Sequence, residues 1–276
     1  MTGSVGAMSN DTHSARHARP VRRVVVTTAV VLVLAGTAAV ATTLDTGDKA
    51  TSDNPAGPNT AADPAPPTPA LPTPAVDPAI VRESEDNGKT VNLTLDDGPD
   101  PRWTPQALEL LKRYKAQAVF CLTGPNAAAH PDLVKRIVAE GHRLCDHAVS
   151  HDTAMDKKPV AYQQKEILDA KKMIDQASGG ARIWYYRAPG GAFTPPSRRI
   201  AAAHGMRNLG WNVDPGDFRR PGADMIVRAV KNQLPKGPTV LLHDGGGNRA
   251  QTIEALEQLL PWFTEQGYAF SFPRAT

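Results

Sequence analysis

The sequence predicts a parallel α/β fold, and its pattern favours a closed or nearly closed barrel over an open sheet. Seven short apolar segments alternate with helical segments between residues 91 and 272, which is typical of a parallel sheet covered by helices. Reactive polar side chains directly follow most of these apolar segments. No Gly-x-Gly-x-x-Gly and no phosphate-binding loop follows a strand, which disfavours an open nucleotide-binding sheet.

The individual elements follow from local patterns. Val91, Leu93 and Leu95 alternate with polar residues as in a strand, and glycines at 141 and 205 are placed to end helices. We expect strands at residues 91–95, 118–122, 142–145, 183–187, 207–213, 239–243 and 268–272. We expect helices from about residue 105 and at residues 131–140, 160–176, 195–204, 223–233 and 252–266.

Composition excludes several classes of protein. The chain has 276 residues, a formal net charge of +3 and 5% aromatic residues. This length suits one or two domains, and the low charge and few aromatic rings argue against nucleic acid as a partner. Two cysteines are too few for a disulfide-rich scaffold or a four-cysteine zinc module.

The first 44 residues have the features of an export segment. Residues 1–23 form a polar, basic cytoplasmic lead ending in Arg22-Arg23, and residues 24–44 contain no charged side chain. A helix of that length would span about 30 Å, the thickness of a bilayer core, with its N-terminus in the cytoplasm. Segment 24–44 is either a retained single-pass signal anchor that binds the membrane, or a signal peptide cleaved near Ala39-Val40-Ala41 to release a secreted protein. Both alternatives place the rest of the chain in an extracytoplasmic location.

A linker is expected to separate this segment from the globular domain. Residues 51–80 contain nine prolines among Thr, Ala and Asp, with very few large apolar side chains. Such a stretch cannot bury enough surface to offset the entropy of ordering it. We therefore assign residues 45–87 to a disordered Pro/Thr/Ala-rich linker and residues 88–276 to the domain.

The reactive residues lie at the carboxyl ends of the expected strands, and parallel barrels place their active sites at that end. They are Asp96, Asp97, His147, His151, Arg187, Asp214, Asp217 and His243.

One carboxylate and two imidazoles, from Asp97, His147 and His151, suit a divalent cation such as zinc with an open coordination position. Two histidines four residues apart are ordinary surface residues when they occur alone, so the indication comes from their combination with Asp97. The neighbouring Asp96 would be free to act as a base. Arg187 can pair with Asp96, and His243, oriented by Asp217, can donate a proton to a leaving group. This set predicts a metal-dependent hydrolase with a separate base and acid.

Five ordered segments strengthen the interpretation: Thr94–Pro99 (TLDDGP), His147–His151 (HAVSH), Arg187–Gly191 (RAPGG), Trp211–Phe218 (WNVDPGDF) and Leu241–His243 (LLH). Together they resemble the motifs of the NodB homology domain, the polysaccharide deacetylases of carbohydrate esterase family 4, over roughly residues 88–273. The resemblance implies a distorted (β/α) barrel, in agreement with the strand pattern.

The resemblance also implies roles for individual residues. Asp96 is the catalytic base paired with Arg187, and His243 is the general acid tuned by Asp217. Asp97, His147 and His151 hold a divalent metal, zinc or alternatively cobalt. The substrate-binding residues are Gly190, whose N–H faces the developing oxyanion, with Pro189, Trp211 and Leu241.

The chain departs from the family pattern at several positions. Leu95, Gly190 and Phe218 replace a Phe, a frequent Tyr and a frequent Trp, and Cys121 replaces an aromatic residue. Strands 118–122 and 142–145 should be neighbours, so Cys121 and Cys145 could form a disulfide in an oxidising exterior. We expect two buried thiols instead, because a disulfide between adjacent parallel strands is geometrically awkward.

The expected reaction is removal of N-acetyl groups from an N-acetylglucosamine-containing polysaccharide, with cell-wall peptidoglycan as the first candidate. Chitin oligosaccharides are the alternative if the export segment is cleaved, and an O-acetyl esterase acting on xylan is a further alternative. A glycan-binding module without catalysis is a different class, which the complete set of motif residues disfavours. The sequence indicates no oligomeric state.

Overall fold

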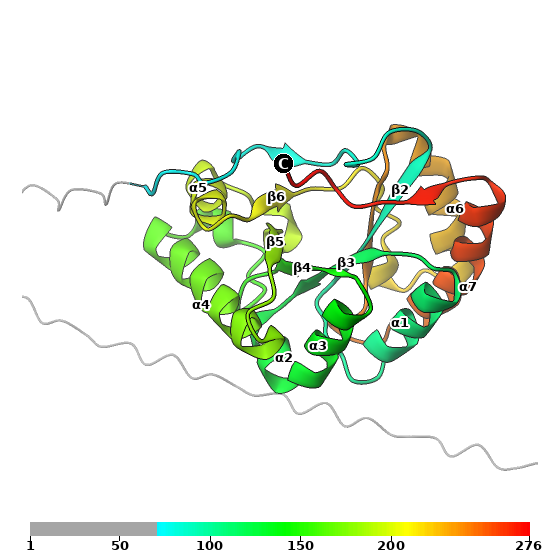
Figure 1. Ribbon diagram of the computed structural model, residues 1–276, viewed down its shortest axis with the longest axis horizontal. Coiled ribbons are helices and arrows are strands. Elements are labelled where there is room, and N and C mark those ends of the chain that lie inside the picture. The colour runs from blue at the N-terminus through cyan, green and yellow to red at the C-terminus, as the bar shows by residue number, and fades with distance from the viewer. Residues whose placement is uncertain (1–70) are drawn as a thin grey trace, which may run out of the picture. The chain divides into compact units, whose positions relative to one another are not determined.

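The structure is a computed structural model that describes residues 71–276 (Figure 1). The expected export segment 24–44 and residues 45–70 of the expected linker lie outside the described residues. Within residues 71–276, no helix has both the length and the apolar composition needed to cross a bilayer.

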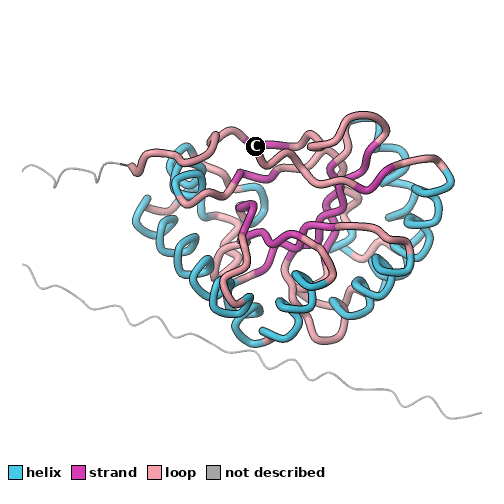
Figure 2. The backbone as a smooth tube through the Cα atoms, in the orientation of Figure 1, coloured by secondary structure: helices cyan, strands magenta, loops and turns pink. Residues whose placement is uncertain are grey.

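A curved parallel sheet organises the described part of the chain. Its strands follow the order β1-β6-β5-β4-β3-β2-β7, and β8 pairs with β2. Figure 2 shows the strands as an inner layer, with the helices along their outer side. The strands are β1 (Ile80–Val81), β2 (Thr90–Asp96), β3 (Ala118–Leu122), β4 (Arg143–Asp146), β5 (Ile183–Tyr186), β6 (Arg207–Leu209), β7 (Thr239–His243) and β8 (Ala269–Phe270).

The chain after β6 closes the curve of the sheet. Leu241 N–H donates to the Val213 carbonyl at 2.9 Å, and Val213 forms a parallel bridge with Val240 of β7. The expected strand 207–213 is therefore divided: its first part pairs with β5 and β1, and its last residues pair with β7. The parallel, barrel-like arrangement is confirmed in this coarse form, with only a short contact at the closure.

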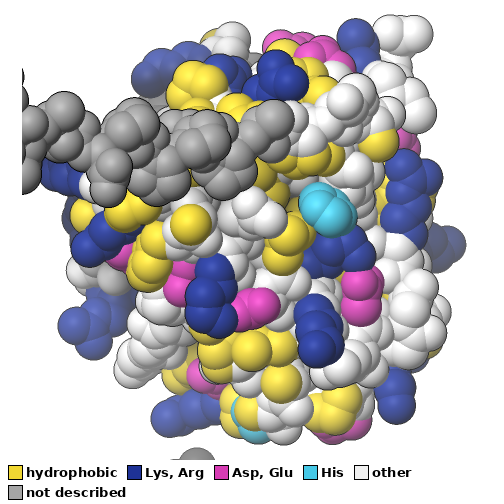
Figure 3. All heavy atoms as spheres, turned by 90° about the vertical axis from the view of Figure 1, so that its left-hand side faces the viewer, with side chains coloured by type: hydrophobic (Ala, Val, Ile, Leu, Met, Phe, Trp, Pro, Cys, Tyr) yellow, Lys and Arg dark blue, Asp and Glu magenta, His cyan; other side chains and the backbone are white. Residues whose placement is uncertain are grey.

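The helices occur where the sequence predicts them, with one addition, α2, which follows β3. They are α1 (Thr104–Arg113), α2 (Gly124–Ala129), α3 (Pro131–Ala139), α4 (Val160–Ser178), α5 (Pro195–Ala203), α6 (Ala223–Gln233) and α7 (Ala250–Glu265). Helix α2 is six residues long and rich in alanine, so it is too short to show the apolar period of a helix. Figure 3 views the side that lies on the left in Figure 1, beside α4 and α5; there, Lys and Arg side chains are interspersed with acidic and apolar ones.

Alternating side chains of the strands build two cores. On β3, Ala118, Phe120 and Leu122 join the main apolar cluster beneath the helices, whereas Val119 and Cys121 join a smaller cluster with Tyr185 and Leu209. Successive side chains of a strand point to opposite faces, so β3 is buried on both sides. This burial is expected for a strand at the centre of a parallel sheet.

Cys121 and Cys145 form a disulfide, and the expectation of two free thiols is wrong. The two residues are direct register partners on β3 and β4, with their Cα atoms 4.2 Å apart. The register also shifts between Leu144 and Cys145 where β4 meets β5. Direct pairing in register brings the two Sγ atoms within bonding distance, so these adjacent parallel strands do admit the bridge.

Residues 71–87, which the sequence pattern assigns to the linker, are part of the described structure. Ile80 and Val81 pair with β6 as β1, and Ser84 forms a bridge with Pro273. Ser84 also donates to the Asn92 side chain at 2.9 Å. The packed region thus begins before residue 88. The sequence pattern places the boundary too late because a two-residue strand beside prolines shows no period.

Replacing both cysteines, as Cys121→Ala/Cys145→Ala, should lower the free energy of unfolding by about 3 kcal/mol, because the bridge restricts the unfolded chain. Urea unfolding monitored by tryptophan fluorescence measures this difference. The single variants should show the same loss. An unchanged unfolding midpoint in the double variant, or in the reduced parent protein, would contradict the structural role of the bridge.

Candidate active site

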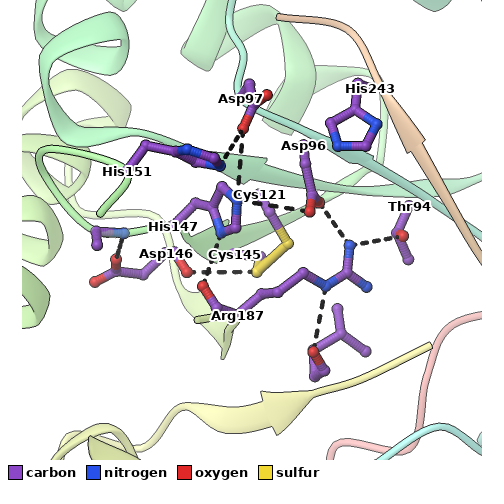
Figure 4. Close-up of polar contacts among 12 residues, drawn as sticks. Thr94, Asp96, Asp97, Cys121, Cys145, Asp146, His147, His151, Arg187 and His243 are labelled. Carbon is purple, nitrogen blue, oxygen red and sulfur yellow. Dashed lines mark hydrogen bonds and ion pairs between the residues drawn. A yellow bond between two sulfur atoms is a disulfide. The ribbon is translucent and has the colours of Figure 1, made fainter. Parts of the chain in front are cut away.

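Three side chains from two strand ends converge at one point. Asp97 follows β2, and His147 and His151 follow β4. Asp97 Oδ1 lies 3.5 Å from His147 Nε2 and 3.1 Å from His151 Nε2, and one ligand atom from each residue lies within 4.8 Å of the others. Figure 4 shows both imidazoles directed toward Asp97. The structure brings these three predicted ligands together.

Backbone geometry separates Asp97 from its neighbour Asp96. Asp96 is the last residue of β2, whereas Asp97 has φ = 73°, in the left-handed region. Non-glycine residues rarely adopt this conformation, and it is enriched at functional sites. It directs the two consecutive carboxylates to different partners.

A backbone contact sets the tautomer of His147. Its Nδ1 lies 2.7 Å from the carbonyl oxygen of Arg187. A carbonyl can only accept, so Nδ1 carries the proton and Nε2 is left with a lone pair facing Asp97. Burial lowers the pKa of His147, despite the nearby carboxylates of Asp96 and Asp97. His147 is therefore neutral, as a metal ligand must be.

Asp97 and His151 shift each other's pKa in opposite directions. Burial alone would raise the pKa of Asp97, but the contact with His151 and the charges of His147 and His243 hold it well below its usual range. The contact with Asp97 raises the pKa of His151, against the effect of its own burial.

The three residues fit a divalent cation. Asp97 Oδ1 is buried, and its ion-pair partners within residues 71–276 are the two imidazole nitrogens of His147 and His151, both of which can bind a metal. A buried carboxylate oxygen is costly unless positive charge compensates it. Two imidazole nitrogens and one carboxylate oxygen are a ligand set typical of catalytic zinc. Asp97 Oδ2 packs closely against Gly246, since a Cβ there would lie 2.5 Å from it.

Asp96 is held beside this cluster by Arg187. Arg187 Nη1 donates to Asp96 Oδ1 at 2.5 Å and to Thr94 Oγ1 at 2.9 Å. The other carboxylate oxygen, Oδ2, lies 3.6 Å from His147 Nε2. Arg187 is fully buried, and its remaining contacts are with the carbonyls of Leu209 and Gly210, both at 3.2 Å. One oxygen of Asp96 is thus fixed while the other faces the cluster.

His243 and Asp217 form a second pair across the pocket. Asp217 Oδ1 lies 2.7 Å from His243 Nδ1, and its Oδ2 accepts from His243 N–H at 2.9 Å and Thr252 Oγ1 at 2.8 Å. Burial lowers the pKa of His243, but the hydrogen bond and charge of Asp217 outweigh it, so the net pKa is raised. Bonding at Nδ1 leaves Nε2 free to face the pocket.

A pocket of about 800 Å³ joins the two groups. Of the predicted substrate-binding residues, Gly190, Trp211 and Leu241 line it. Gly190 has φ = 59°, and its N–H donates to no acceptor within residues 71–276. Pro189 is buried and is not among the lining residues. Pro189 begins the turn that presents Gly190, and its assignment as a substrate-binding residue stays a prediction.

Comparisons with known proteins agree with this geometry. Residues 83–209 match the family model described as polysaccharide deacetylase. The chain is 37% identical over 190 residues to a peptidoglycan-N-acetylglucosamine deacetylase of Bacillus cereus, covering 68% of this chain and 88% of that protein. The chain belongs to the polysaccharide deacetylase family. A second relative in this family, a chitooligosaccharide deacetylase of Sinorhizobium fredii, is 34% identical over 200 residues, covering 68% of this chain and 92% of that protein.

One solved structure shows that a polysaccharide deacetylase fold does not guarantee activity. A pseudoenzyme of carbohydrate esterase family 4 from Bacillus anthracis superposes with a TM-score of 0.64 at 26% identity, covering 70% of this chain and 66% of that one. Whether this chain is active therefore depends on which site residues it contains. Here the three candidate ligands, the Asp96–Arg187 pair and the Asp217–His243 pair all surround one pocket.

Asp244 is a buried acid near the site for which the sequence suggested no role. It is fully buried and accepts from Thr104 Oγ1 at 2.6 Å. Burial raises its pKa to about 7. A Cβ on Gly98 would lie 2.6 Å from Asp244 Oδ1, so only glycine fits beside it. In the sequence, the glycine of Asp97-Gly98-Pro99 is the one sign that another group packs closely against this turn.

We expect one zinc or cobalt ion to bind per chain, with His147→Ala abolishing stoichiometric binding because it removes a ligand nitrogen. Asp96→Asn should retain the metal, since Asp96 is held by Arg187 and lies outside the ligand set. Metal content after dialysis, measured by mass spectrometry, tests this difference. Equal metal content in the two variants would contradict the assignment of His147 to the ligand set and of Asp96 outside it.

Proposed function

We propose that this chain hydrolyses N-acetyl groups of an N-acetylglucosamine-containing polysaccharide outside the cytoplasm, with peptidoglycan as its target. The observation that carries the proposal is the convergence of three metal-ligand candidates with a buried carboxylate on one side and an Asp–His pair on the other. The named deacetylase relatives support the reaction class. They include both peptidoglycan and chitooligosaccharide deacetylases, so chitin oligosaccharides remain the alternative substrate.

Asp97, His147 and His151 would hold the cation, for which zinc is our first candidate and cobalt the second. Bound there, it supplies Lewis-acid catalysis. Asp96 takes a proton from the attacking water through Oδ2, the oxygen that Arg187 leaves free. The geometry needs no covalent enzyme intermediate, because water is the nucleophile.

The opposite side of the pocket completes the reaction. The Gly190 N–H donates to the developing oxyanion, and one such donor is worth about 3 kcal/mol. Trp211 and Leu241 provide apolar surface for the acetyl methyl group. His243 then gives the proton on Nε2 to the departing sugar nitrogen, so that acetate and a free amine are the products.

The proposed location rests on two features. Residues 24–44 have the length and flanking charges of a signal anchor or signal peptide. The Cys121–Cys145 bridge supports an oxidising exterior, since disulfides are rare in the cytosol. A retained anchor would hold the domain next to the cell wall.

Acetate release from peptidoglycan, chitin oligomers and acetylated xylan, assayed in parallel, tests the proposal. We expect the highest kcat/KM on peptidoglycan, loss of activity on chelation and recovery with added zinc or cobalt. Asp96→Asn should lose at least about 100-fold in kcat, because general base catalysis contributes that much. Full activity in the demetallated protein, or release from xylan alone, would contradict the proposal.

The pH dependence follows from His243. The acid must be protonated to act, and Asp217 raises its pKa, so activity should fall as the pH rises through that value. Asp217→Asn removes the charge and should move this alkaline limb to lower pH, with a smaller effect on kcat at acidic pH. Profiles of kcat between pH 5 and 10 measure the shift. An unmoved alkaline limb would show that another group is the acid.

A further inference from the structure

Two arginines beside the active-site pocket have no role in the proposed reaction. Arg219 ends the 3-10 turn Asp217–Arg219, and Arg220 follows it. Both side chains are exposed, and neither lies within 4.0 Å of an acidic group in residues 71–276. Arg219 lines the active-site pocket, and both arginines line an adjoining hollow of about 380 Å³ beside the start of α7. The two hollows therefore share Arg219.

The turn that carries them is tied to the catalytic pair. The carboxylate of Asp217 is fixed by His243 and Thr252, and its carbonyl accepts from Arg220 N–H at 2.9 Å. Arg220 has φ = 58°, a conformation that is uncommon for a residue with a side chain and that is found mostly where function requires it. The turn thus fixes the backbone positions of both arginines beside the pocket.

Aromatic contacts connect Arg219 with the general acid. The Phe218 ring lies 5.4 Å from the His243 ring, and the Arg219 guanidinium lies over Phe218, 4.6 Å from its centroid. Phe218 is 40% exposed, so it forms part of the pocket wall. Arg219 therefore stands one aromatic ring away from the catalytic imidazole.

The charge at this end of the pocket does not suit the reacting sugar. An N-acetyl sugar is neutral and its amine product is cationic, so guanidinium groups offer the first no charge pairing and repel the second. Besides Asp96 and Asp97, one acidic residue, Asp214, lines the pocket. Its carboxylate accepts from Gly216 N–H at 2.9 Å and forms no ion pair with Arg219. The positive charge is thus uncompensated by the described residues.

We propose that Arg219 and Arg220 form an anion subsite, which binds a carboxylate or phosphate carried by the glycan next to the sugar that is deacetylated. This inference rests on the proposed function and specifies its substrate class as an anionic glycan. Arginine pairs with both groups through two parallel hydrogen bonds. Stacking on Phe218 limits the freedom of the Arg219 side chain before the glycan binds.

The experiment compares three glycans of equal length: neutral chitotetraose, a peptidoglycan fragment with free carboxylates, and a phosphate-substituted N-acetylglucosamine oligomer. In Arg219→Gln/Arg220→Gln, kcat/KM on an anionic glycan relative to chitotetraose should fall about tenfold, through KM, and the difference should shrink at high salt. The control, Arg199→Gln/Arg228→Gln, removes the same charge from exposed positions on α5 and α6 that line neither hollow.

A fall confined to the carboxylate arm or to the phosphate arm identifies the source of the anion, and a fall in both assigns a general oxyanion subsite. Unchanged ratios for both anionic glycans, or an equal fall in the control variant, would overturn the inference. Calorimetric binding of the same glycans distinguishes this failure from that of the proposed function. A parent protein that releases no acetate overturns the reaction, whereas the relative Kd values still decide the subsite.

Discussion

The site depends on the buried side chain of Arg187. A fully buried guanidinium is destabilising unless it is paired and its N–H groups are satisfied, and here Asp96, Thr94 and two carbonyls of the chain after β6 accept them. The same residue accepts the Nδ1 proton of His147 through its own carbonyl. Arg187 therefore positions the proposed base with its side chain and a proposed metal ligand with its backbone. Because its partners come from β2, β6 and the loop after β4, one side chain ties together the elements that carry the site.

The division of work between Asp96 and Asp97 follows from backbone conformation. Asp96 keeps the extended conformation of β2 and its hydrogen bonds to the start of the loop after β7, whose Asp244 and Gly245 N–H groups donate to its carbonyl. Asp97 turns into the left-handed region and meets two imidazoles. A Cβ at Gly245 would lie 2.2 Å from the Asp97 carbonyl oxygen, so glycine after β7 is required for this packing. Two adjacent, chemically identical side chains thus meet different partners.

Much of this arrangement can be predicted from the sequence, because the reactive residues follow apolar strand segments and parallel strands place their carboxyl ends together. The strands β2, β3, β4, β5 and β7, and the residues that meet at their ends, were found in this way. The disulfide was not, because the apolar pattern does not specify which residues of β3 and β4 lie directly opposite each other. The sequence does not predict β1, because two residues are too few to show the alternation of a strand. It does not predict the burial of Asp244 either, because a single buried acid leaves no local pattern.

The central claim is that Asp97, His147 and His151 bind one cation beside the Arg187-held Asp96. A crystal of the zinc-loaded protein, with anomalous diffraction recorded on both sides of the zinc K edge, tests it most directly. We predict a single anomalous peak bonded to Asp97 Oδ1 and to Nε2 of both histidines, with Asp96 outside bonding distance. Absence of a peak there, or a zinc ion bonded to Asp96 in place of Asp97, would contradict the account.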